Sequence, residues 1–221
     1  MAYEYYFFDL DGTLTNPKEG ITRSAQYALK HFGIHEPDLD RLIPFIGPPL
    51  KDSFQEFYHL TPDQIPTAIA KFRERFSTVG WKENEVLEGV PEMLEILYGQ
   101  GKRLVLASSK VEEYVRRIMD RFNFSPYFCE IVGATMDEKR GEKKYIIQEG
   151  IRRLGLEGNP DLRDRILMVG DRKHDVEGAH LCGLRCMGIY TGFAEDGELE
   201  KAGAEYIVHS VEEMKEKLAS L

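Results

Sequence analysis

The segment YYFFDLDGT, residues 5–13, joins a run of four aromatic residues to two aspartates and a glycine. A short apolar run that stops at an Asp-Gly turn is typical of a buried β-strand. Side chains alternate between the two faces of an extended chain, so Asp9 and Asp11 lie on the same face. Gly12 allows a sharp turn whose amide groups can face an anion. The segment therefore predicts a first strand with two cooperating carboxylates at its carboxyl end.

Short apolar runs that alternate with longer helical patterns follow this segment along the chain. Alternation of this kind is typical of βαβ units, in which a helix returns the chain for the next parallel strand. We therefore predict an α/β fold whose core is a Rossmann-like, doubly wound parallel sheet. The expected strands lie at 4–9, 103–108, 130–133, 165–170, 185–190 and 205–208, and the expected helices at 90–99, 111–122, 143–154, 175–182 and 211–219.

The stretch from residue 15 to residue 82 departs from this alternation. Where a prompt second strand would be expected, the chain carries helical spacing at 20–31, 39–46, 50–58 and 62–76, with the breaker Gly47-Pro48-Pro49 among them. We expect a discontinuous α/β core domain at 1–14 and 83–221. The expected second domain is a small α-helical cap at 15–82, inserted into the first.

The composition argues against several classes of protein. Apolar residues make up 42% of the 221 residues and charged residues 30%, enough for a core and a charged surface. The net charge of -9 argues against a nucleic-acid binder, which normally concentrates positive charge. We see neither a signal-peptide pattern nor an apolar run of roughly 20 residues, the length of a membrane helix. We expect a cytoplasmic protein that binds neither nucleic acid nor membrane.

The cysteines do not predict a disulfide framework. There are three of them, an odd number for a chain of this size, at Cys129, Cys182 and Cys186. Cys182 and Cys186 are close in sequence, but no second pair and no partnering histidine accompanies them. We interpret them as reduced, buried thiols and not as a metal or redox site.

Two other predicted strands also end in polar residues. Ligands of an open parallel sheet bind beyond the carboxyl ends of its strands, so these residues are candidates for a site. Ser108-Ser109-Lys110 follows one strand, and Asp171 and Asp175 follow another. Four residues apart at a helix start, the two aspartates share one side of the first turn. Together with Asp9, Asp171 predicts a site for Mg²⁺, which binds carboxylates, waters and phosphate oxygens.

Each of these residues also has an ordinary structural explanation. The helix dipole favours acidic side chains at a helix start, which would account for Asp171 and Asp175. A serine after a strand, such as Ser108, often caps a helix, whereas its functional use would be to bind a phosphoryl oxygen. Lys143 or Lys144 is a candidate to balance charge in phosphoryl transfer, although lysines at a helix start are usually solvated.

Four motifs resemble, in kind and in order, those of the haloacid dehalogenase superfamily of phosphohydrolases. They are DLDGT at 9–13, LASSK at 106–110, EKKYII at 142–147 and GDRKHD at 170–175. IGPPL at 46–50 and GFAEDGEL at 192–199 further resemble the phosphoglycolate phosphatase-like branch. The resemblance spans the chain. It implies that the inserted helices are the cap that these enzymes place between the first and second motifs.

The resemblance also implies a role for the motif residues. Asp9 would attack phosphorus in line, while Asp11 would protonate the leaving oxygen and later deprotonate water. Lys143 would balance charge near Asp9. It is preferred to Lys144 because family members tend to place the motif lysine four residues before the second apolar residue of a pair, here Ile147.

The ligand contacts follow from the same resemblance. Mg²⁺ would lie between Asp9, the carbonyl oxygen of Asp11 and Asp171, with Asp175 either as a further ligand or as a carboxylate that contacts the ligands and not the ion. Ser108 and backbone amides would hold the phosphoryl group. The remaining candidates for substrate binding are Gly12, Thr13 and Ser109 in the core, and Arg23, Gly47 and Lys51 in the cap.

The implied activity is that of a Mg²⁺-dependent phosphomonoester hydrolase, phosphoglycolate phosphatase-like, acting on a small phosphorylated metabolite as a monomer or homodimer. Alternatives within the family are a 5′-nucleotidase, a protein phosphatase or a β-phosphoglucomutase-like phosphotransferase. The mutase is disfavoured because no histidine occurs in Leu14-Thr15-Asn16-Pro17. A receiver-like module, which holds phosphate on aspartate as a signal, is an alternative from another class. Asp11 argues against it, because a base two residues from the nucleophile predicts rapid dephosphorylation.

Overall fold

The computed structural model describes residues 3–136 and 141–221. The chain forms two compact units, one made of the residues up to Asn16 together with Val86–Leu221, the other of Pro17–Glu85. We call them the core unit and the inserted unit. The sequence placed the two boundaries after residues 14 and 82, whereas the structure places them after Asn16 and Glu85.

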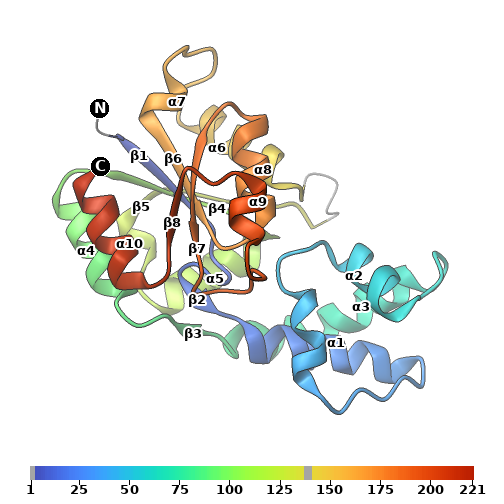
Figure 1. Cartoon of the computed structure of the whole chain (residues 1–221). Helices are drawn as coiled ribbons and strands as arrows, with labels where there is room; N and C mark the ends of the chain where they lie inside the picture. Colours follow the sequence, from blue (N-terminus) through green and yellow to red (C-terminus); the bar gives the residue numbers. More distant parts are fainter. Residues whose placement is uncertain (1–2, 137–140) are drawn as a thin grey trace. The chain divides into compact units, whose positions relative to one another are not determined.

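A six-stranded sheet with the order β5-β4-β1-β6-β7-β8 runs through the core unit (Figure 1). All the pairings between neighbouring strands are parallel, so the predicted Rossmann-like α/β fold is confirmed. The strands are β1 (Tyr5–Phe8), β4 (Arg103–Val111), β5 (Phe128–Ala134), β6 (Ile166–Gly170), β7 (Arg185–Ile189) and β8 (Tyr206–Val208). A further two-stranded sheet pairs β2 (Thr15–Asn16) with β3 (Glu85–Val86), where the chain passes between the units.

The strand register determines which polar residues can meet. Phe8, the last residue of β1, pairs with Leu106 of β4 on one side and with Val169 of β6 on the other. The three strands therefore reach the same edge of the sheet together. Because β1 lies between β4 and β6, the segments after these three strands converge on the residue that follows Phe8.

Helices cover both faces of the sheet, as expected for a parallel sheet. Those of the core unit are α4 (Val90–Gly99), α5 (Glu112–Arg121), α6 (Lys143–Arg153), α7 (Leu162–Arg165), α8 (Lys173–Leu181), α9 (Glu198–Ala202) and α10 (Val211–Ser220), with a 3₁₀ turn η3 (Ser125–Tyr127). α4, α5, α6, α8 and α10 correspond to the predicted helices. The sequence missed α7 and α9, because helices of four and five residues contain too few apolar positions to show a helical period.

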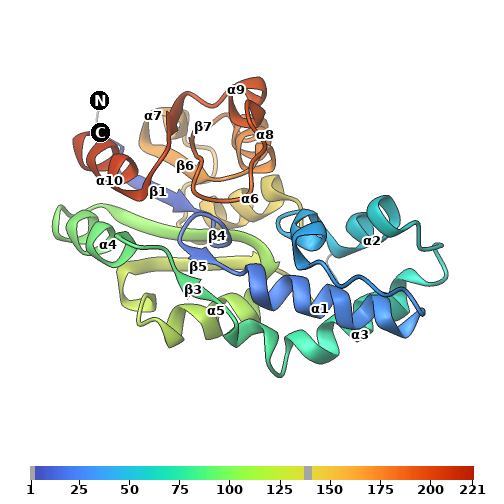
Figure 2. The same ribbon diagram turned by 60° about the horizontal axis from the view of Figure 1, so that its bottom comes forward.

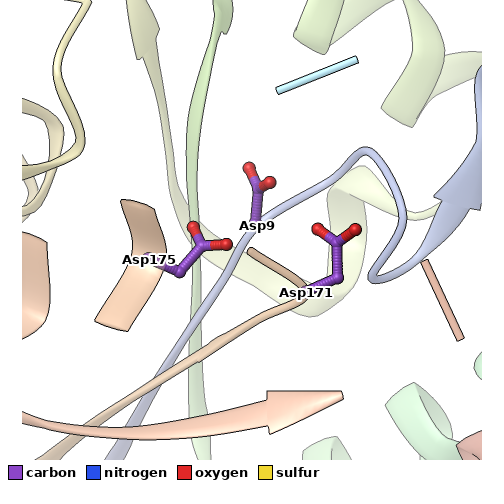
Figure 3. Close-up of side chains that lie close together, drawn as sticks. All are labelled: Asp9, Asp171 and Asp175. Atoms are coloured by element: carbon purple, nitrogen blue, oxygen red, sulfur yellow. The ribbon is translucent and has the colours of Figure 1, made fainter. Parts of the chain in front are cut away.

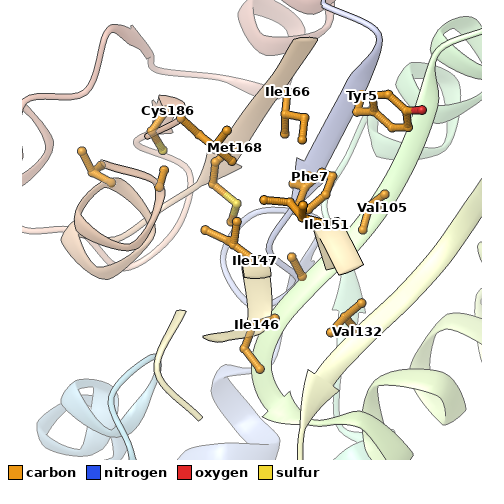
Figure 4. Packing of buried hydrophobic residues seen from close by; sticks show 14 of the residues in the cluster. Tyr5, Phe7, Val105, Val132, Ile146, Ile147, Ile151, Ile166, Met168 and Cys186 are labelled. Atoms are coloured by element: carbon orange, nitrogen blue, oxygen red, sulfur yellow. The ribbon is translucent and has the colours of Figure 1, made fainter. Parts of the chain in front are cut away.

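Alternate residues of β1 serve the two faces of the sheet. Tyr5 and Phe7 belong to the cluster packed under α6 and α8 (Figure 4), whereas Tyr6 faces the other side and donates a hydrogen bond to the carbonyl oxygen of Leu218 at 2.8 Å. Figure 2 shows α4, α5 and α10 together on that other side. Both faces of β1 are therefore buried, which explains why the strand is aromatic at every position and does not alternate.

The inserted unit consists of helices, as the sequence predicted for this stretch. They are α1 (Lys18–His31), η1 (Leu39–Phe45), α2 (Leu50–Tyr58), α3 (Ile65–Phe76) and η2 (Gly80–Lys82). The predicted helix at 39–46 is a 3₁₀ helix, which is consistent with Pro44 in its interior, where proline donates no backbone hydrogen bond. Within this unit, Arg75 forms a bidentate ion pair with Glu83, at 2.7 and 2.8 Å.

Among the residues that the structure describes, no helix is both long enough and apolar enough to cross a membrane. The expectation of a cytoplasmic protein that avoids membranes goes beyond this finding and stays a prediction.

Phe7 offers a test of the core. Its side chain is fully buried, and the aromatic ring lies so close to Gly150 of α6 that a Cβ there would be 2.8 Å from it. We expect Phe7→Ala to lower the free energy of unfolding by about 3–5 kcal/mol, because it leaves a cavity between β1 and α6. Urea denaturation measures this change. Tyr98→Ala, at a side chain that is 56% exposed, is the control, and an equal loss in the two variants would contradict the packing.

Candidate active site

Asp9 and Asp11 follow β1 on a turn that is closed by backbone hydrogen bonds. The Asp9 amide donates to the Val169 carbonyl oxygen at 2.9 Å, which extends the pairing with β6 by one residue. The chain then reverses at Gly12, whose φ of +83° favours glycine. A Cβ on Gly12 would lie 2.1 Å from Oδ2 of Asp171. The turn can therefore pack against the Asp171 carboxylate only because residue 12 has no side chain.

Ser108, Ser109 and Lys110 lie in a bulge near the end of β4. The strand pairs Ala107 with Val132 and Val111 with Ala134, so β4 contains two more residues than β5 between these two pairs. The sequence ended this strand at residue 108 because the polar residues of the bulge read as a loop. Ser108 is buried, and its Oγ accepts a hydrogen bond from the Lys110 amide at 3.3 Å.

The bulge decides between the two interpretations of Ser108. Helix α5 begins at Glu112, and the residue that precedes it is Val111. Ser108 lies three residues before that position, so the N-cap explanation for this serine is wrong. Its hydroxyl accepts the hydrogen bond from the Lys110 amide and can still donate one to a ligand.

Asp171 and Asp175 come from β6 and α8. Asp171 directly follows β6, and its Oδ2 accepts a hydrogen bond from the Phe193 amide at 2.8 Å. Asp175 lies in the first turn of α8, where its Oδ2 accepts from the Arg172 amide at 3.1 Å. Asp175 is thus a helix-capping residue as well as a member of the acidic cluster. Its structural role does not exclude a second one, because its other oxygen faces the site.

Three carboxylates converge in the space beyond the sheet. Asp9, Asp171 and Asp175 each offer an oxygen, and these atoms all lie within 4.8 Å of one another (Figure 3). Oδ1 of Asp171 is buried and has no hydrogen-bond partner among the described residues. A buried carboxylate oxygen without a partner is costly, and a hard divalent cation would satisfy it. The residues present therefore fit Mg²⁺ as the bound group.

The electrostatics of the cluster point the same way. Burial raises the pKa of Asp171 well above its usual range, and the charges of Asp175 and Asp9 raise it further. Burial also raises the pKa of Asp175, although the charge of Lys143 opposes the rise. Both shifts mean that the ionised carboxylates lack compensating charge. A cation between them would reverse both effects.

Lys143 supplies part of that charge. Its Nζ lies 2.9 Å from Oδ1 of Asp9 and 2.7 Å from Oδ1 of Asp175, and it donates a hydrogen bond to the carbonyl oxygen of Ala107 at 2.8 Å. Burial alone would lower the pKa of Lys143, but the charges of Asp175 and Asp9 raise it above its ordinary value. Lys144 instead pairs with Glu142 at 3.1 Å. The structure thus brings Lys143, and not Lys144, to Asp9.

Two contributors escaped the sequence analysis. Lys110, which the sequence places after a predicted strand but to which it assigns no role, contacts both carboxylate oxygens of Asp11, at 2.6 and 2.5 Å. Burial raises the pKa of Asp11, and the charge of Lys110 opposes the rise. The other contributor is the Gly192-Phe193 segment, which packs against Asp171. A Cβ on Gly192 would lie 2.0 Å from Oδ2 of Asp171, so only glycine allows this close approach. The glycine that opens GFAEDGEL at 192–199 is the one feature of the sequence that could have indicated this contact.

The remaining candidates divide between the two units. In the core unit Thr13 is buried, its Oγ1 has no hydrogen-bond partner among the described residues, and Ser109 is half-buried. In the inserted unit Arg23, Gly47 and Lys51 are all exposed, and Arg23 pairs with Glu19 at 2.9 Å. Their contacts with a substrate stay predictions.

Comparison with known proteins agrees with the motifs. The family model described as haloacid dehalogenase-like hydrolase matches residues 6–189. A 5′-nucleotidase of Pseudomonas aeruginosa is 43% identical over 199 residues, covering 90% of this chain and 88% of that protein. The crystal structure of a predicted phosphatase from Clostridium acetobutylicum superposes with a TM-score of 0.94 at 39% identity, covering 100% of both chains.

Two other relatives carry different names. A phosphoglycolate phosphatase of Aquifex aeolicus is 30% identical over 186 residues and covers 80% of each chain. The tyrosine-protein kinase PtkA of Mycobacterium tuberculosis is 32% identical over 213 residues, covering 96% of this chain and 71% of that protein. Proteins similar to this chain over most of its length therefore differ in the acceptor or substrate that their names indicate.

The acidic cluster predicts a response to Mg²⁺ that needs no substrate. Binding at one hundred times the dissociation constant stabilises a folded protein by about 2.7 kcal/mol. We expect Mg²⁺ to raise the melting temperature of the wild-type protein and to leave that of Asp171→Asn nearly unchanged. In metal-free buffer Asp171→Asn should melt above the wild type, because it removes a buried charge that lies beside two others.

Differential scanning fluorimetry with and without Mg²⁺ measures both effects. Asp161→Asn, which changes an exposed aspartate, is the matched control and should respond to Mg²⁺ as the wild type does. A full Mg²⁺ response in Asp171→Asn would place the ion elsewhere.

Proposed function

The chain belongs to the haloacid dehalogenase-like hydrolase family, and from this premise we propose that it hydrolyses phosphate monoesters of small metabolites through a phosphoryl group carried on Asp9. That it is a phosphatase follows from the family and from relatives named 5′-nucleotidase and phosphoglycolate phosphatase. The covalent intermediate, the metal and the substrate are the finer parts of the proposal.

The observation that carries the proposal is the environment of Asp9. Its carboxylate lies beside the Lys143 ammonium and within reach of Asp171 and Asp175, and the bulge of the neighbouring strand β4 carries the buried Ser108. A nucleophilic carboxylate needs positive charge close by, because the phosphoryl group that it attacks is itself negative. Lys143 provides one such charge, and the acidic cluster is suited to hold another.

In the first half-reaction an oxygen of Asp9 forms a bond to phosphorus as the bond from phosphorus to the ester oxygen breaks. The ester oxygen leaves as an alcohol with a proton from Asp11. In the second, water attacks the same phosphorus, its proton passes to Asp11, and the bond between phosphorus and Asp9 breaks. Inorganic phosphate departs, Asp9 returns as a carboxylate, and Asp11 is protonated again.

The charges of the site favour a divalent cation as the cofactor. Asp9, Asp171 and Asp175 bring three carboxylates to the acidic cluster, against the one ammonium group of Lys143 that contacts it. When these groups are ionised, two negative charges remain, which would repel a phosphate dianion. Mg²⁺ held by Asp9, Asp171 and Asp175 would balance them and would polarise a phosphoryl oxygen. The protein's part is then to hold the carboxylates in place.

Nucleoside 5′-monophosphates are the substrates to test first, because over the aligned residues the relative named 5′-nucleotidase is 43% identical to this chain and the one named phosphoglycolate phosphatase 30%. In the inserted unit, Arg23, Gly47 and Lys51 are the candidates to contact the leaving group. The likeness to PtkA adds a second candidate function, transfer of the phosphoryl group to a tyrosine. Release of inorganic phosphate without a protein acceptor decides for hydrolysis.

Asp9→Asn tests the nucleophile. We expect it to abolish phosphate release from nucleoside 5′-monophosphates, 2-phosphoglycolate and sugar phosphates alike, because no other group can replace the attacking oxygen. The measurement is a phosphate-release screen with and without Mg²⁺, in which the wild type should turn over only with the metal. Asp161→Asn, at an exposed position, should keep the wild-type rates. Turnover by Asp9→Asn at the wild-type rate would disprove the nucleophile.

Lys143 and Lys144 form a matched pair, since they are neighbours and only one of them reaches Asp9. We expect Lys143→Met to lower kcat/KM by a factor of about 10² or more, because it removes a charge that the transition state needs. Lys144→Met should change kcat/KM by less than about twofold, as expected for a surface ion pair. Steady-state kinetics on the best substrate measure both. Equal losses in the two variants would contradict the assignment.

A further inference from the structure

Asp11 is held by a lysine of its own. Nζ of Lys110 lies 2.6 Å from Oδ1 of Asp11 and 2.5 Å from Oδ2, so the ammonium group contacts both carboxylate oxygens at once. The pair is well shielded, with the side chains only 8% and 11% exposed. An exposed ion pair would add little, but a shielded pair with two contacts fixes the plane of the carboxylate.

The bulge in β4 brings Lys110 to this position. With two extra residues between Ala107 and Val111, the strand turns its polar run toward the edge of the sheet where β1 ends. The Lys110 amide donates to Oγ of Ser108, which ties the backbone of the lysine to the serine beside the site. The bulge therefore carries Ser108 and Lys110 together, and from it the Lys110 side chain reaches the Asp11 carboxylate.

We propose that Lys110 is a positioning residue that orients the Asp11 carboxylate for proton transfer to the leaving oxygen and from water. The inference rests on the proposed function, in which Asp11 moves a proton in both half-reactions. Proton transfer requires the carboxyl oxygen within about 2.6–3.2 Å of the oxygen that it serves. A carboxylate that rotates freely would reach this geometry only part of the time, and the two contacts from Lys110 remove that freedom.

The two shielded lysines contact different reacting carboxylates. Lys143 contacts Asp9 and the metal-binding Asp175, while Lys110 contacts Asp11. Loss of Lys143 should therefore impair the attack on phosphorus, whatever the leaving group. Loss of Lys110 should impair only the steps in which a proton moves, so the two lysines can be distinguished by changing the leaving group.

The variants that test this are Lys110→Met, Lys110→Arg, Asp11→Asn and the double variant Asp11→Asn/Lys110→Met, with the exposed Lys217→Met as control. On an alkyl phosphate we expect Lys110→Met to lower kcat by roughly 10²-fold and to change KM by less than about twofold. Lys110→Arg keeps the charge and should recover part of the loss. The double variant should be no slower than Asp11→Asn, because Lys110 acts through Asp11.

A second substrate separates the two half-reactions. The leaving group of 4-nitrophenyl phosphate needs no proton, so Lys110→Met and Asp11→Asn should still transfer its phosphoryl group to Asp9 and should stall before hydrolysis. Stopped-flow measurement should show a burst of about one equivalent of 4-nitrophenolate per enzyme in these variants. Lys217→Met should behave as the wild type.

Three results would overturn the role of Lys110. They are a loss expressed mainly in KM, a double variant whose losses multiply, or a Lys110→Met protein that shows no burst although Asp11→Asn does. Melting temperatures identify a variant that has not folded. If Lys110→Met does not fold, Lys110→Gln replaces it, both alone and combined with Asp11→Asn, and the same comparisons are made beside Lys110→Arg. Asp9→Asn is assayed alongside: if it stays active, the proposed function itself fails, whereas an inactive Asp9→Asn leaves only the Lys110 inference in question.

Discussion

The repulsion between carboxylates confined at one edge of the sheet is the constraint on which the rest of the structure depends. Asp9, Asp171 and Asp175 hold oxygens within 4.8 Å of one another, and two of them are almost fully buried. Such an arrangement is unfavourable unless positive charge lies within it. The fold supplies part of that charge with Lys143, and Oδ1 of Asp171 still has no hydrogen-bond partner among the described residues. The chemistry of these residues therefore fits a bound cation, which is the basis of the proposed use of Mg²⁺.

The parallel sheet makes this confinement possible. β1 lies between β4 and β6 in matched register, so residues that are far apart in sequence arrive at one edge. Glycines then let the segments approach closely, since a Cβ on Gly12 or Gly192 would collide with the Asp171 carboxylate. The aromatic residues of β1 are buried on both faces and hold the strand in place. The packing of β1 in the core therefore fixes the position of Asp9, which directly follows the strand.

Sequence reasoning could predict the parts of this structure that rest on periodicity and on residue type. The aromatic run before Asp9 and the long helices carry strong local signals, the clustered aspartates are recognisable only in combination, and the choice of Lys143 over Lys144 agrees with the geometry. The bulge in β4 could not be predicted, because a bulge depends on pairing with β5 and its polar residues resemble a loop. Lys110 was missed for the same reason. One-turn helices such as α7 leave no periodic pattern, and the substrate depends on contacts that no motif specifies.

Chemical trapping of the intermediate tests the central claim most directly. An acyl phosphate on an aspartate is reduced by borohydride to homoserine, so a reaction stopped during turnover records which carboxylate carried the phosphoryl group. The account predicts that mass spectrometry of the digested protein finds homoserine in place of Asp9, and only when substrate was present. Homoserine at another aspartate, or steady turnover with none formed at any position, would contradict it.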